Sequence, residues 1–496
     1  GYSINIMMKI FTKKAVKKVS KIKKFTKKNI PNLRYGMIHC QFGYHDGVSI
    51  VMKQIERVMV NHLGVPEKNI FYLVGRSRQH GPNITIKPIL WIKNKTNQLM
   101  IKRFGEGYGG NRSERIEKAI SKAKLIIEDF IRKNKIDVLI AHNTCHPVNF
   151  VLSVALHRYY RDTIKKNQKT PKYILWWHDS HLERKSFQHP ANDVEQYLLH
   201  GVPGPFVEYI VFINSLQFKE AEKYFLKLDK IKPGYFDSMH KNHTVMYNTT
   251  ETFIDSYDDL ESDKFSDRIE KFLEDFKIRE LLKEKHLTLS QVLFCLQHTR
   301  IVDRKRIDFA LRYSFELFKQ KVKTGKHTKA FYFLVSGHRT DRSKSKLIRL
   351  HKKLCKEYNT DKFFLVFAED FDGKTDIKFE EYPIIFAKLR GFATYFSEIE
   401  GFGNNLLEVL ASGLIPVVYT YPVFVNDIAK QKFKVIALDK FEIEQEAIDK
   451  TIDILRKDRK RKIWVNRNLK ILRRKFPHKI IAFKLKRAII RRRLHK

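Results

Sequence analysis

The stretch GFATYFSEIEGFGNNLLEVLASGLIPVVYT, residues 391–420, decides the fold of this 496-residue chain. A short apolar run leads into a turn with two glycines. A small helix follows, with Asn404 as its predicted start and Gly413 just past its end, where helices favour a left-handed residue. A second apolar run then returns to the sheet. This order predicts a strand, loop, helix and strand of a parallel α/β sheet.

The same alternation extends over most of the chain. Before residue 250 the predicted strands are 37–41, 69–74, 137–142, 173–177, 209–214 and 243–247. After residue 288 they are 291–297, 330–337, 362–368, 391–396 and 414–420. The predicted helices between them include 48–63, 113–134 and 148–160. Strands that alternate with helices are typical of doubly wound sheets, so we expect two Rossmann-like α/β domains.

The length also favours two domains, because single cores stop growing at roughly 250–300 residues. We expect a basic leader at 1–34 and a first Rossmann-like domain at 35–250. An acidic connector at 251–288 then leads to the second domain at 289–460. Residues 461–496 are the predicted final helix and basic tail.

Composition narrows the class of protein. Apolar residues make up 43% of the chain, which fits a globular protein. No stretch approaches 18 uninterrupted apolar residues, so the sequence predicts no membrane-spanning helix. The four cysteines have no paired spacing and indicate free thiols in a reducing compartment; they are Cys40, Cys145, Cys295 and Cys355. The sequence therefore predicts a cytoplasmic protein.

The formal net charge of +43 is unevenly distributed. Residues 9–30 contain no acid, and their apolar residues recur at helical spacing: Phe11, Ala15, Val19, Ile22 and Phe25. Such a segment is typical of helices that lie on anionic membrane surfaces, and a solvated extension is the alternative interpretation. The basic tail repeats the pattern. We therefore expect peripheral membrane contact through residues 9–30, or none.

The loop after the predicted strand 391–396 has the chemistry of a nucleotide-sugar site. Gly401 and Gly403 let backbone N–H groups approach a ligand, and the helix start that follows favours an anion such as phosphate. Carboxylates repel phosphate but accept hydrogen bonds from hydroxyls. Glu408 is therefore a candidate for holding a ribose, and Glu400 for holding a sugar.

The segment EGFGNNLLEVLASGLIPVV, residues 400–418, resembles the E-x7-E segment of retaining GT-B glycosyltransferases of the family four type. The resemblance implies a GT-B fold, with two Rossmann-like domains facing across a cleft. It also implies that the predicted final helix crosses back to the first domain. It gives Glu400 to the donor sugar and Glu408 to the ribose. The residues of the same loop that it implies for donor binding are Gly401, Phe402, Gly403 and Asn404.

Further segments resemble other parts of these enzymes. Arg300 and Lys305 match the two cations that bind the donor diphosphate. Gly337, in VSGHRTD, resembles a loop near the nucleotide, with a structural turn as the alternative. EDFDG (369–373) contains a D-x-D-like triplet, but the cations and the helix start suffice for the diphosphate, so no metal or other cofactor is predicted.

The first half supplies the remaining candidates. GYHDGVSIVMKQI (43–55) resembles the glycine loop that approaches diphosphate and acceptor, with Gly47 on the donor side. A histidine of this half touches the donor sugar in the family, and His178 is the candidate, with a structural histidine as the alternative. The predicted acceptor-side residues are Asp46, Ser49, His142, Asn143 and Asp179.

The sequence thus predicts a retaining glycosyltransferase that moves a sugar from a nucleoside-diphosphate sugar to a hydroxyl of a glycan, lipid or small molecule. Its predicted catalytic residues are Glu400, Arg300, Lys305 and His178. The alternative hypothesis is a non-catalytic basic α/β protein that binds nucleic acid or an anionic membrane. Nucleic acid is disfavoured because acidic side chains at the cleft repel phosphate backbones and no RNA- or DNA-binding motif is present. Base, sugar and acceptor remain open.

Overall fold

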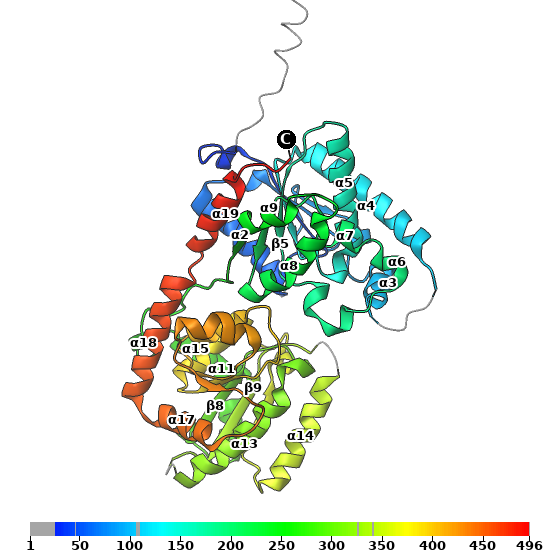
Figure 1. The fold of residues 1–496 in the computed structure, drawn as a ribbon. Helices are drawn as coiled ribbons and strands as arrows, with labels where there is room; N and C mark the ends of the chain where they lie inside the picture. Colours follow the sequence, from blue (N-terminus) through cyan, green and yellow to red (C-terminus); the bar gives the residue numbers. More distant parts are fainter. Residues whose placement is uncertain (1–24, 45, 106–109, 325–326, 340–341, 496) are drawn as a thin grey trace, which may run out of the picture.

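The computed structural model describes residues 25–44, 46–105, 110–324, 327–339 and 342–495 (Figure 1). Most of the predicted basic segment 9–30 therefore lies outside the described residues. Two parallel sheets form the centres of two α/β domains, and this confirms the fold predicted from the sequence. Among the described residues, no helix combines the length and apolar character needed to cross a bilayer.

The first domain contains a seven-stranded sheet in the order β3-β2-β1-β4-β5-β6-β7, with every pair parallel. Its strands are β1 (Tyr35–His39), β2 (Ile70–Val74), β3 (Ile84–Ile86), β4 (Val138–His142), β5 (Lys172–Trp176), β6 (Tyr209–Phe212) and β7 (His243–Val245). Its helices are α2 (Gly47–Leu63), α3 (Lys95–Arg103), α4 (Ser113–Asn134), α5 (Phe150–Lys165), α6 (Asn192–Glu195), α7 (Leu198–Gly201), α8 (Ser215–Asp229) and α9 (Tyr235–Lys241).

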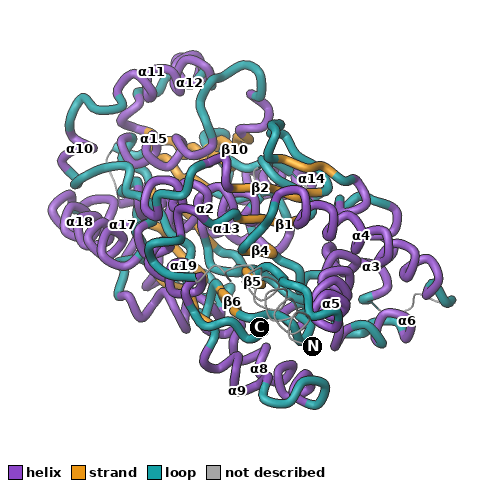
Figure 2. The backbone as a smooth tube through the Cα atoms, turned by 90° about the horizontal axis from the view of Figure 1, so that it is seen from above, coloured by secondary structure: helices purple, strands orange, loops and turns teal. Residues whose placement is uncertain are grey.

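Helices cover both faces of this sheet. Figure 2 shows its strands side by side, with α2 on one side and α3, α4 and α5 on the other. The five central strands are buried almost throughout, because parallel strands between two helical layers read as continuous apolar runs. This burial explains why those strands were recognisable in the sequence.

The second domain contains a six-stranded parallel sheet in the order β10-β9-β8-β11-β12-β13. Its strands are β8 (Val292–Gln297), β9 (Ala330–Val335), β10 (Phe363–Phe367), β11 (Phe392–Tyr395), β12 (Pro416–Tyr419) and β13 (Ile436–Leu438). Its helices are α13 (Ile307–Thr324), α14 (Ser343–Glu357), α15 (Tyr382–Lys388), α16 (Asn404–Ala411), α17 (Gln445–Arg456) and α18 (Asp458–Lys475). The pattern predicted around residues 391–420 is confirmed, with α16 between β11 and β12.

The sequence interpretation missed β3 and β13. Each has only three residues and lies at the edge of its sheet. The residues of β3 are half-buried, and the middle residue of β13 is exposed. Neither strand therefore forms the long apolar run by which buried strands are recognised.

Two segments outside the sheets pack onto the domains: the acidic segment packs onto the second domain, and the last helix packs onto the first. The acidic segment after residue 250 forms α10 (Asp258–Glu261), α11 (Ser266–Asp275) and α12 (Ile278–Glu284), and Phe272 of α11 joins the core of the second domain. The last helix, α19 (Lys479–Ile490), packs against α2 of the first domain, and Leu485 is buried there with Met37 of β1. In Figure 1, α18 runs along the second domain and α19 continues onto the first.

Candidate active site

Loops at the carboxyl ends of the strands meet where the two domains contact each other. Asn214, which follows β6, donates a hydrogen bond from Nδ2 to the carbonyl of Gly401 over 2.7 Å. Ser215 donates from its backbone N–H and its hydroxyl to Asp427, over 3.2 and 2.5 Å. The first bond holds the loop after β11 against the first domain, and the other two hold the helical turn Phe424–Ile428, which follows β12. We call the residues around the loop after β11 the inter-domain site.

A buried carboxylate lies at the centre of the inter-domain site. Glu400 is bonded to the ammonium of Lys305 and accepts a hydrogen bond from Tyr395 Oη over 3.0 Å. Arg304 Nη1 lies 3.5 Å from the second carboxylate oxygen. Burial would raise the pKa of Glu400, but the charges of Lys305 and Arg304 outweigh it and lower that pKa to about 2. Glu400 is therefore ionised at neutral pH.

The two predicted diphosphate cations have different environments. Lys305, in the 3-10 turn Asp303–Lys305, is buried, and this burial lowers its pKa while Glu400 opposes the shift. Arg300 is exposed and forms no ion pair or hydrogen bond with any residue that the structure describes. Lys305 thus uses at least one of its three N–H donors in its bond to Glu400. The guanidinium of Arg300 is available to a ligand.

The turn that follows Lys305 is unusual. Arg306 has a φ of 48°, in the left-handed region that side chains rarely adopt. Its side chain bonds Asp308 over 3.1 Å, approaches Glu398 to 3.3 Å and lies over the ring of Phe441 at 4.2 Å. These contacts hold a non-glycine residue in the conformation that starts α13 and places Lys305 next to Glu400.

The second glutamate of the motif lies on α16. Glu408 Oε2 is bonded to His298 Nε2 over 2.9 Å, and His298 Nδ1 lies 2.8 Å from Ser336 Oγ. Glu408 Oε1 has no hydrogen-bond partner among the described residues, and the side chain is 24% exposed. One carboxylate oxygen is therefore free to accept bonds from ligand hydroxyls.

Sequence reasoning missed His298. It follows β8 directly, its ring stacks on Phe379 at 4.1 Å, and its side chain is fully buried. Its position just after a predicted strand could have identified it as a candidate, because Arg300 was chosen for the same reason. What the sequence did not show is that a helix 110 residues further along the chain supplies its carboxylate partner.

The glycine-rich loop itself has mixed roles. Gly403 has a φ of 121°, so a side chain there would be strained. The ring of Phe402 is buried and stacks on Tyr247 at 5.0 Å, which leaves only its backbone for donor binding. Asn404 is the first residue of α16, and its buried Oδ1 has no hydrogen-bond partner in the described structure. The first N–H groups of α16 lack intrahelical partners, as at every helix start.

Two other predicted glycines differ from each other. A Cβ on Gly337 would lie 2.7 Å from the backbone nitrogen of Arg300, too close for any side chain. Gly337 thus lets the chain after β9 pack against the chain that carries Arg300. A Cβ on Gly47 would meet no described atom within 4 Å, so nothing in the described structure requires glycine there.

Two residues predicted to face the acceptor instead stabilise the start of α2. Asp46 is the N-cap of α2 and accepts hydrogen bonds from the backbone and the hydroxyl of Ser49, over 3.0 and 2.6 Å. Gln41 donates to the same carboxylate over 3.1 Å. Ser49 is buried, which differs from the exposed position that acceptor contact requires.

The predicted histidines follow β4 and β5 and form a buried pair. His142 Nδ1 lies 3.1 Å from His178 Nε2, and His142 is fully buried. Burial and the charge of His39 lower the pKa of His178 to about 3, so it is neutral at pH 7. A Cβ on Gly401 would lie 3.7 Å from the carbonyl oxygen of His178, which places His178 beside the loop after β11. His142 lies behind it and does not face an acceptor, contrary to expectation.

Asn143 and Asp179, which follow these two histidines in the chain, form hydrogen bonds within the protein. Asn143 is buried with a φ of 58°, and its backbone carbonyl accepts a hydrogen bond from Asn149 over 2.9 Å. Asp179 accepts a hydrogen bond from Arg184 Nε over 2.7 Å, and Arg184 Nη2 lies 2.5 Å from the same oxygen. Of the predicted acceptor-side set, only Asp179 and Asp46 keep partly exposed side chains near the site.

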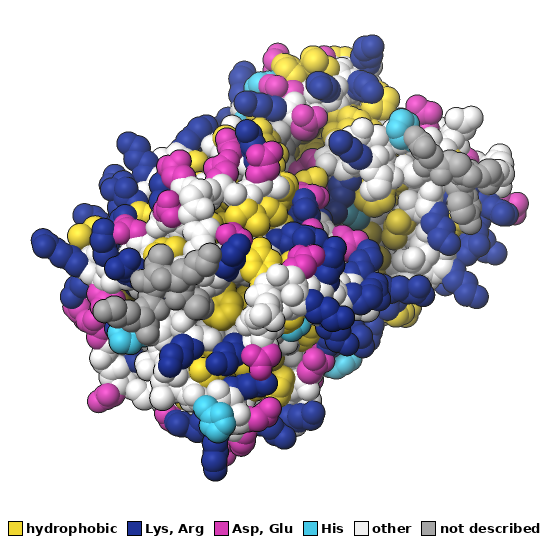
Figure 3. Space-filling model, turned by 90° about the horizontal axis from the view of Figure 1, so that it is seen from below, with side chains coloured by type: hydrophobic (Ala, Val, Ile, Leu, Met, Phe, Trp, Pro, Cys, Tyr) yellow, Lys and Arg dark blue, Asp and Glu magenta, His cyan; other side chains and the backbone are white. Residues whose placement is uncertain are grey.

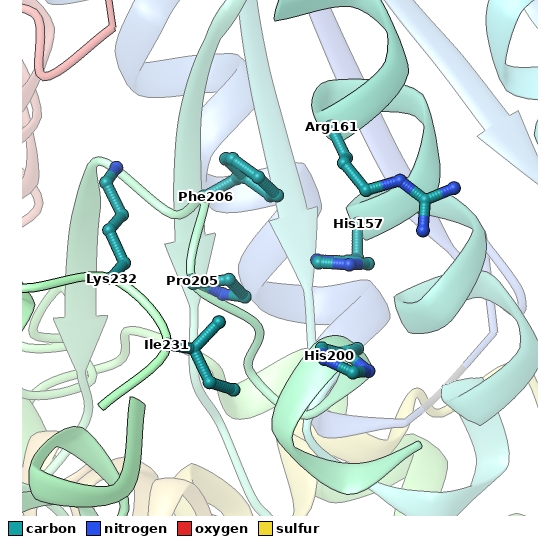
Figure 4. Close-up of a pocket in the computed structure, with 7 residues that line it drawn as sticks. All are labelled: His157, Arg161, His200, Pro205, Phe206, Ile231 and Lys232. Carbon is teal, nitrogen blue, oxygen red and sulfur yellow. The ribbon is translucent and has the colours of Figure 1, made fainter. Parts of the chain in front are cut away.

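A pocket of about 350 Å³ lies elsewhere, on the first domain (Figure 4). Its lining residues include His157 of α5, Phe206 just before β6 and Lys232 after α8. These positions are at the amino ends of the strands, whereas ligands of open α/β sheets collect at the carboxyl ends. This pocket is therefore separate from the inter-domain site. In the described residues, no three His, Cys, Asp or Glu side chains cluster as metal ligands.

Comparison with known proteins agrees with this geometry. No protein-family model matches the chain. The mannosylglucosylglycerate synthase of Petrotoga mobilis is 28% identical over 428 residues, which cover 82% of this chain and 86% of the relative. A glycosyltransferase from Rickettsia africae has a similar structure, with a TM-score of 0.55 at 13% identity, and covers 92% of this chain and 99% of its own.

A second structural neighbour is Anabaena Alr3699/HepE, solved in complex with UDP and glucose. Its TM-score is 0.54 at 11% identity, and the match covers 93% of this chain and 100% of that one. The chain is a glycosyltransferase with a GT-B fold. In this glycosyltransferase Glu400, Lys305, Arg300 and Glu408 lie on loops and a helix of the second domain that face the first.

Proposed function

We propose that this glycosyltransferase is a retaining hexosyltransferase, which moves a sugar from a nucleoside-diphosphate sugar to a hydroxyl of a small acceptor. The observation that carries the proposal is the arrangement around Glu400. An ionised, buried carboxylate lies next to cations, with the exposed Arg300 nearby and the partly exposed Glu408 on the helix that follows. Carboxylates suit the hydroxyls of sugar and ribose, and the cations suit a diphosphate.

The relatives support the same donor and acceptor classes. The Anabaena protein is described with UDP and glucose, which are the parts of a nucleotide sugar. The name of the Petrotoga relative denotes the synthesis of a small glycoside. We therefore assign the donor to the second domain and a small hydroxyl acceptor to the first. The base and the sugar of the donor are left to experiment.

In the proposed reaction, Arg300 holds the diphosphate and stabilises the negative charge that grows as it departs. Glu400, fixed by Lys305 and Tyr395, accepts hydrogen bonds from the donor sugar, and Glu408 accepts bonds from the ribose. The acceptor oxygen forms the new bond to the anomeric carbon on the face from which the diphosphate leaves. The hydroxyl proton passes to the departing diphosphate. Contact between the domains keeps water from the reacting carbon.

We also propose that no metal ion takes part, because Arg300 and the start of α16 supply positive charge for the diphosphate. Peripheral contact with an anionic membrane remains a prediction, since residues 1–24 lie outside the described part of the chain. Figure 3 shows Lys and Arg side chains scattered over one face among acidic and apolar ones.

The proposal is tested by incubating the protein with UDP-, GDP- and ADP-sugars and measuring release of the nucleoside diphosphate. We expect one nucleotide class to be cleaved and the matching nucleoside diphosphate to raise the melting temperature. At 100 times its Kd, such a ligand adds about 2.7 kcal/mol to the free energy of unfolding. Stabilisation by DNA or RNA, with no effect of any nucleoside diphosphate, would favour the nucleic-acid hypothesis instead.

A further inference from the structure

Two arginines and two aromatic rings form a cluster at the carboxyl end of the first sheet. Arg76 and Arg78 follow β2, Tyr44 follows β1, and Trp91 follows the 3-10 turn Pro88–Leu90. The guanidinium carbon of Arg76 lies 5.1 Å from the ring centroid of Tyr44 and 4.9 Å from that of Trp91. That of Arg78 lies 4.9 Å from the centroid of Tyr44. We call these four residues the arginine–tyrosine cluster.

The backbone that carries the cluster is held in place. Phe42 donates its N–H to the carbonyl of Arg76 over 2.9 Å and accepts a bond from the N–H of Arg78 over 3.1 Å. A Cβ on Gly75 would collide with the backbone of Trp91, so the two segments are in direct contact. The guanidinium groups are thus presented from a fixed frame, which lowers the entropy lost when they bind a ligand.

Among the described residues, neither guanidinium has a counter-ion. No residue in the described part of the chain forms an ion pair or a side-chain hydrogen bond with Arg76 or Arg78, and both are exposed. Two like charges against one ring repel each other, and cation–π contact compensates by only about 0.5–1 kcal/mol at an exposed site. An anion bound by either guanidinium would reduce the repulsion. Guanidinium forks match the two oxygens of a carboxylate or a phosphate.

The cluster lies at the carboxyl end of the first sheet, the end whose loops contribute to the inter-domain site. Asp46, two residues after Tyr44, and Arg184 are both close enough to Arg300 to influence its pKa. The diphosphate of the donor already has Arg300 and the start of α16 on the other domain. A second group of free cations on the first domain therefore has a different anion to bind.

We propose that Arg76 and Arg78 determine acceptor specificity by binding an anionic group of the acceptor, a carboxylate or a phosphate, while a hydroxyl of the same molecule faces the donor. This inference rests on the proposed function, because it names the charge class of the acceptor. The cluster fixes one end of the acceptor, and the distance from that end selects which hydroxyl reacts.

The test compares three acceptors: glucosylglycerate, which carries a carboxylate, glucose 6-phosphate, and the neutral glucosylglycerol. We expect wild-type enzyme to use at least one acid with a lower KM than the neutral compound. In the Arg76→Ala/Arg78→Ala variant the KM for that acid rises about 10- to 100-fold, the range for losing charged hydrogen bonds. The kcat and the KM for donor and neutral acceptor stay within about twofold.

Two variants serve as controls. Arg349→Ala removes an exposed arginine of α14, outside the site, and should leave every constant unchanged. The Arg76→Lys/Arg78→Lys variant keeps the charge and should recover part of the affinity for the acid. Which acid shows the effect identifies carboxylate or phosphate as the bound group.

Calorimetric binding of the three acceptors separates this inference from the proposed function. Equal affinity of wild-type protein for acids and neutral compound, or an acid preference that survives in the double alanine variant, would overturn the role of the cluster even if transfer occurs. Loss of acid binding in that variant supports it even if none of the tested donors is cleaved, a result that would count against the proposed reaction alone.

Discussion

Glu400→Gln is expected to lower the rate of sugar transfer by at least about 100-fold. The amide keeps the shape of the side chain but removes the charge that binds Lys305 and that, in the proposed reaction, accepts hydrogen bonds from the donor sugar. Loss of one such electrostatic contact costs roughly 2.7–4 kcal/mol of transition-state stabilisation. The measurement is the rate of nucleoside-diphosphate release in the presence of acceptor.

Glu398→Gln is the matched control. Glu398 lies on the same loop, is 45% exposed at its side chain and, within the described part of the chain, forms an ion pair only with Arg306. We expect this variant to retain most activity. The melting temperature of Glu400→Gln must be measured as well, because breaking a buried pair costs about 3–5 kcal/mol. Near-normal turnover by folded Glu400→Gln protein would remove this carboxylate from the mechanism.

Arg300→Ala is expected to reduce transfer by about 100- to 1000-fold and to abolish thermal stabilisation by the nucleoside diphosphate. Since Arg300 forms no ion pair or hydrogen bond with the described residues, the variant should unfold at the wild-type temperature. This separates it from Lys305, whose replacement would leave Glu400 unpaired. Arg300→Lys should recover part of the activity, because it restores the charge without the fork.

Wild-type behaviour of the Arg300→Ala variant would contradict the proposed role of Arg300. A variant Arg300→Ala that binds the nucleoside diphosphate and turns over like wild type would place the diphosphate elsewhere. The cations of the described structure that remain near Glu400, Lys305 and Arg304, would then be the ones to test next.

Much of the fold could be predicted from the sequence, because buried parallel strands read as apolar runs and their order predicts the topology. Only the three-residue edge strands β3 and β13 were missed. The segment around residues 391–420 was informative for a further reason. Its glycines, its small helix and both glutamates are close in sequence, so a local pattern is enough to predict the loop.

The rest of the site depends on contacts between distant residues. The sequence indicated Lys305 and Glu400 separately, but not that the ammonium is bonded to that carboxylate. His298 was missed because its partner Glu408 is on another element. Ser49 and His142 were misplaced since capping and burial, which a single sequence does not reveal, decide where those side chains point. Arg76 and Arg78 lacked any motif.

The central claim is that the residues around Glu400 bind a nucleotide sugar. A crystal structure with the nucleoside diphosphate that stabilises the protein tests it most directly. The account predicts the diphosphate within hydrogen-bond distance of Arg300 and the start of α16, with a ribose hydroxyl on Glu408. A diphosphate bound away from both groups, or a nucleotide held by the pocket at the amino ends of the first sheet, would contradict it.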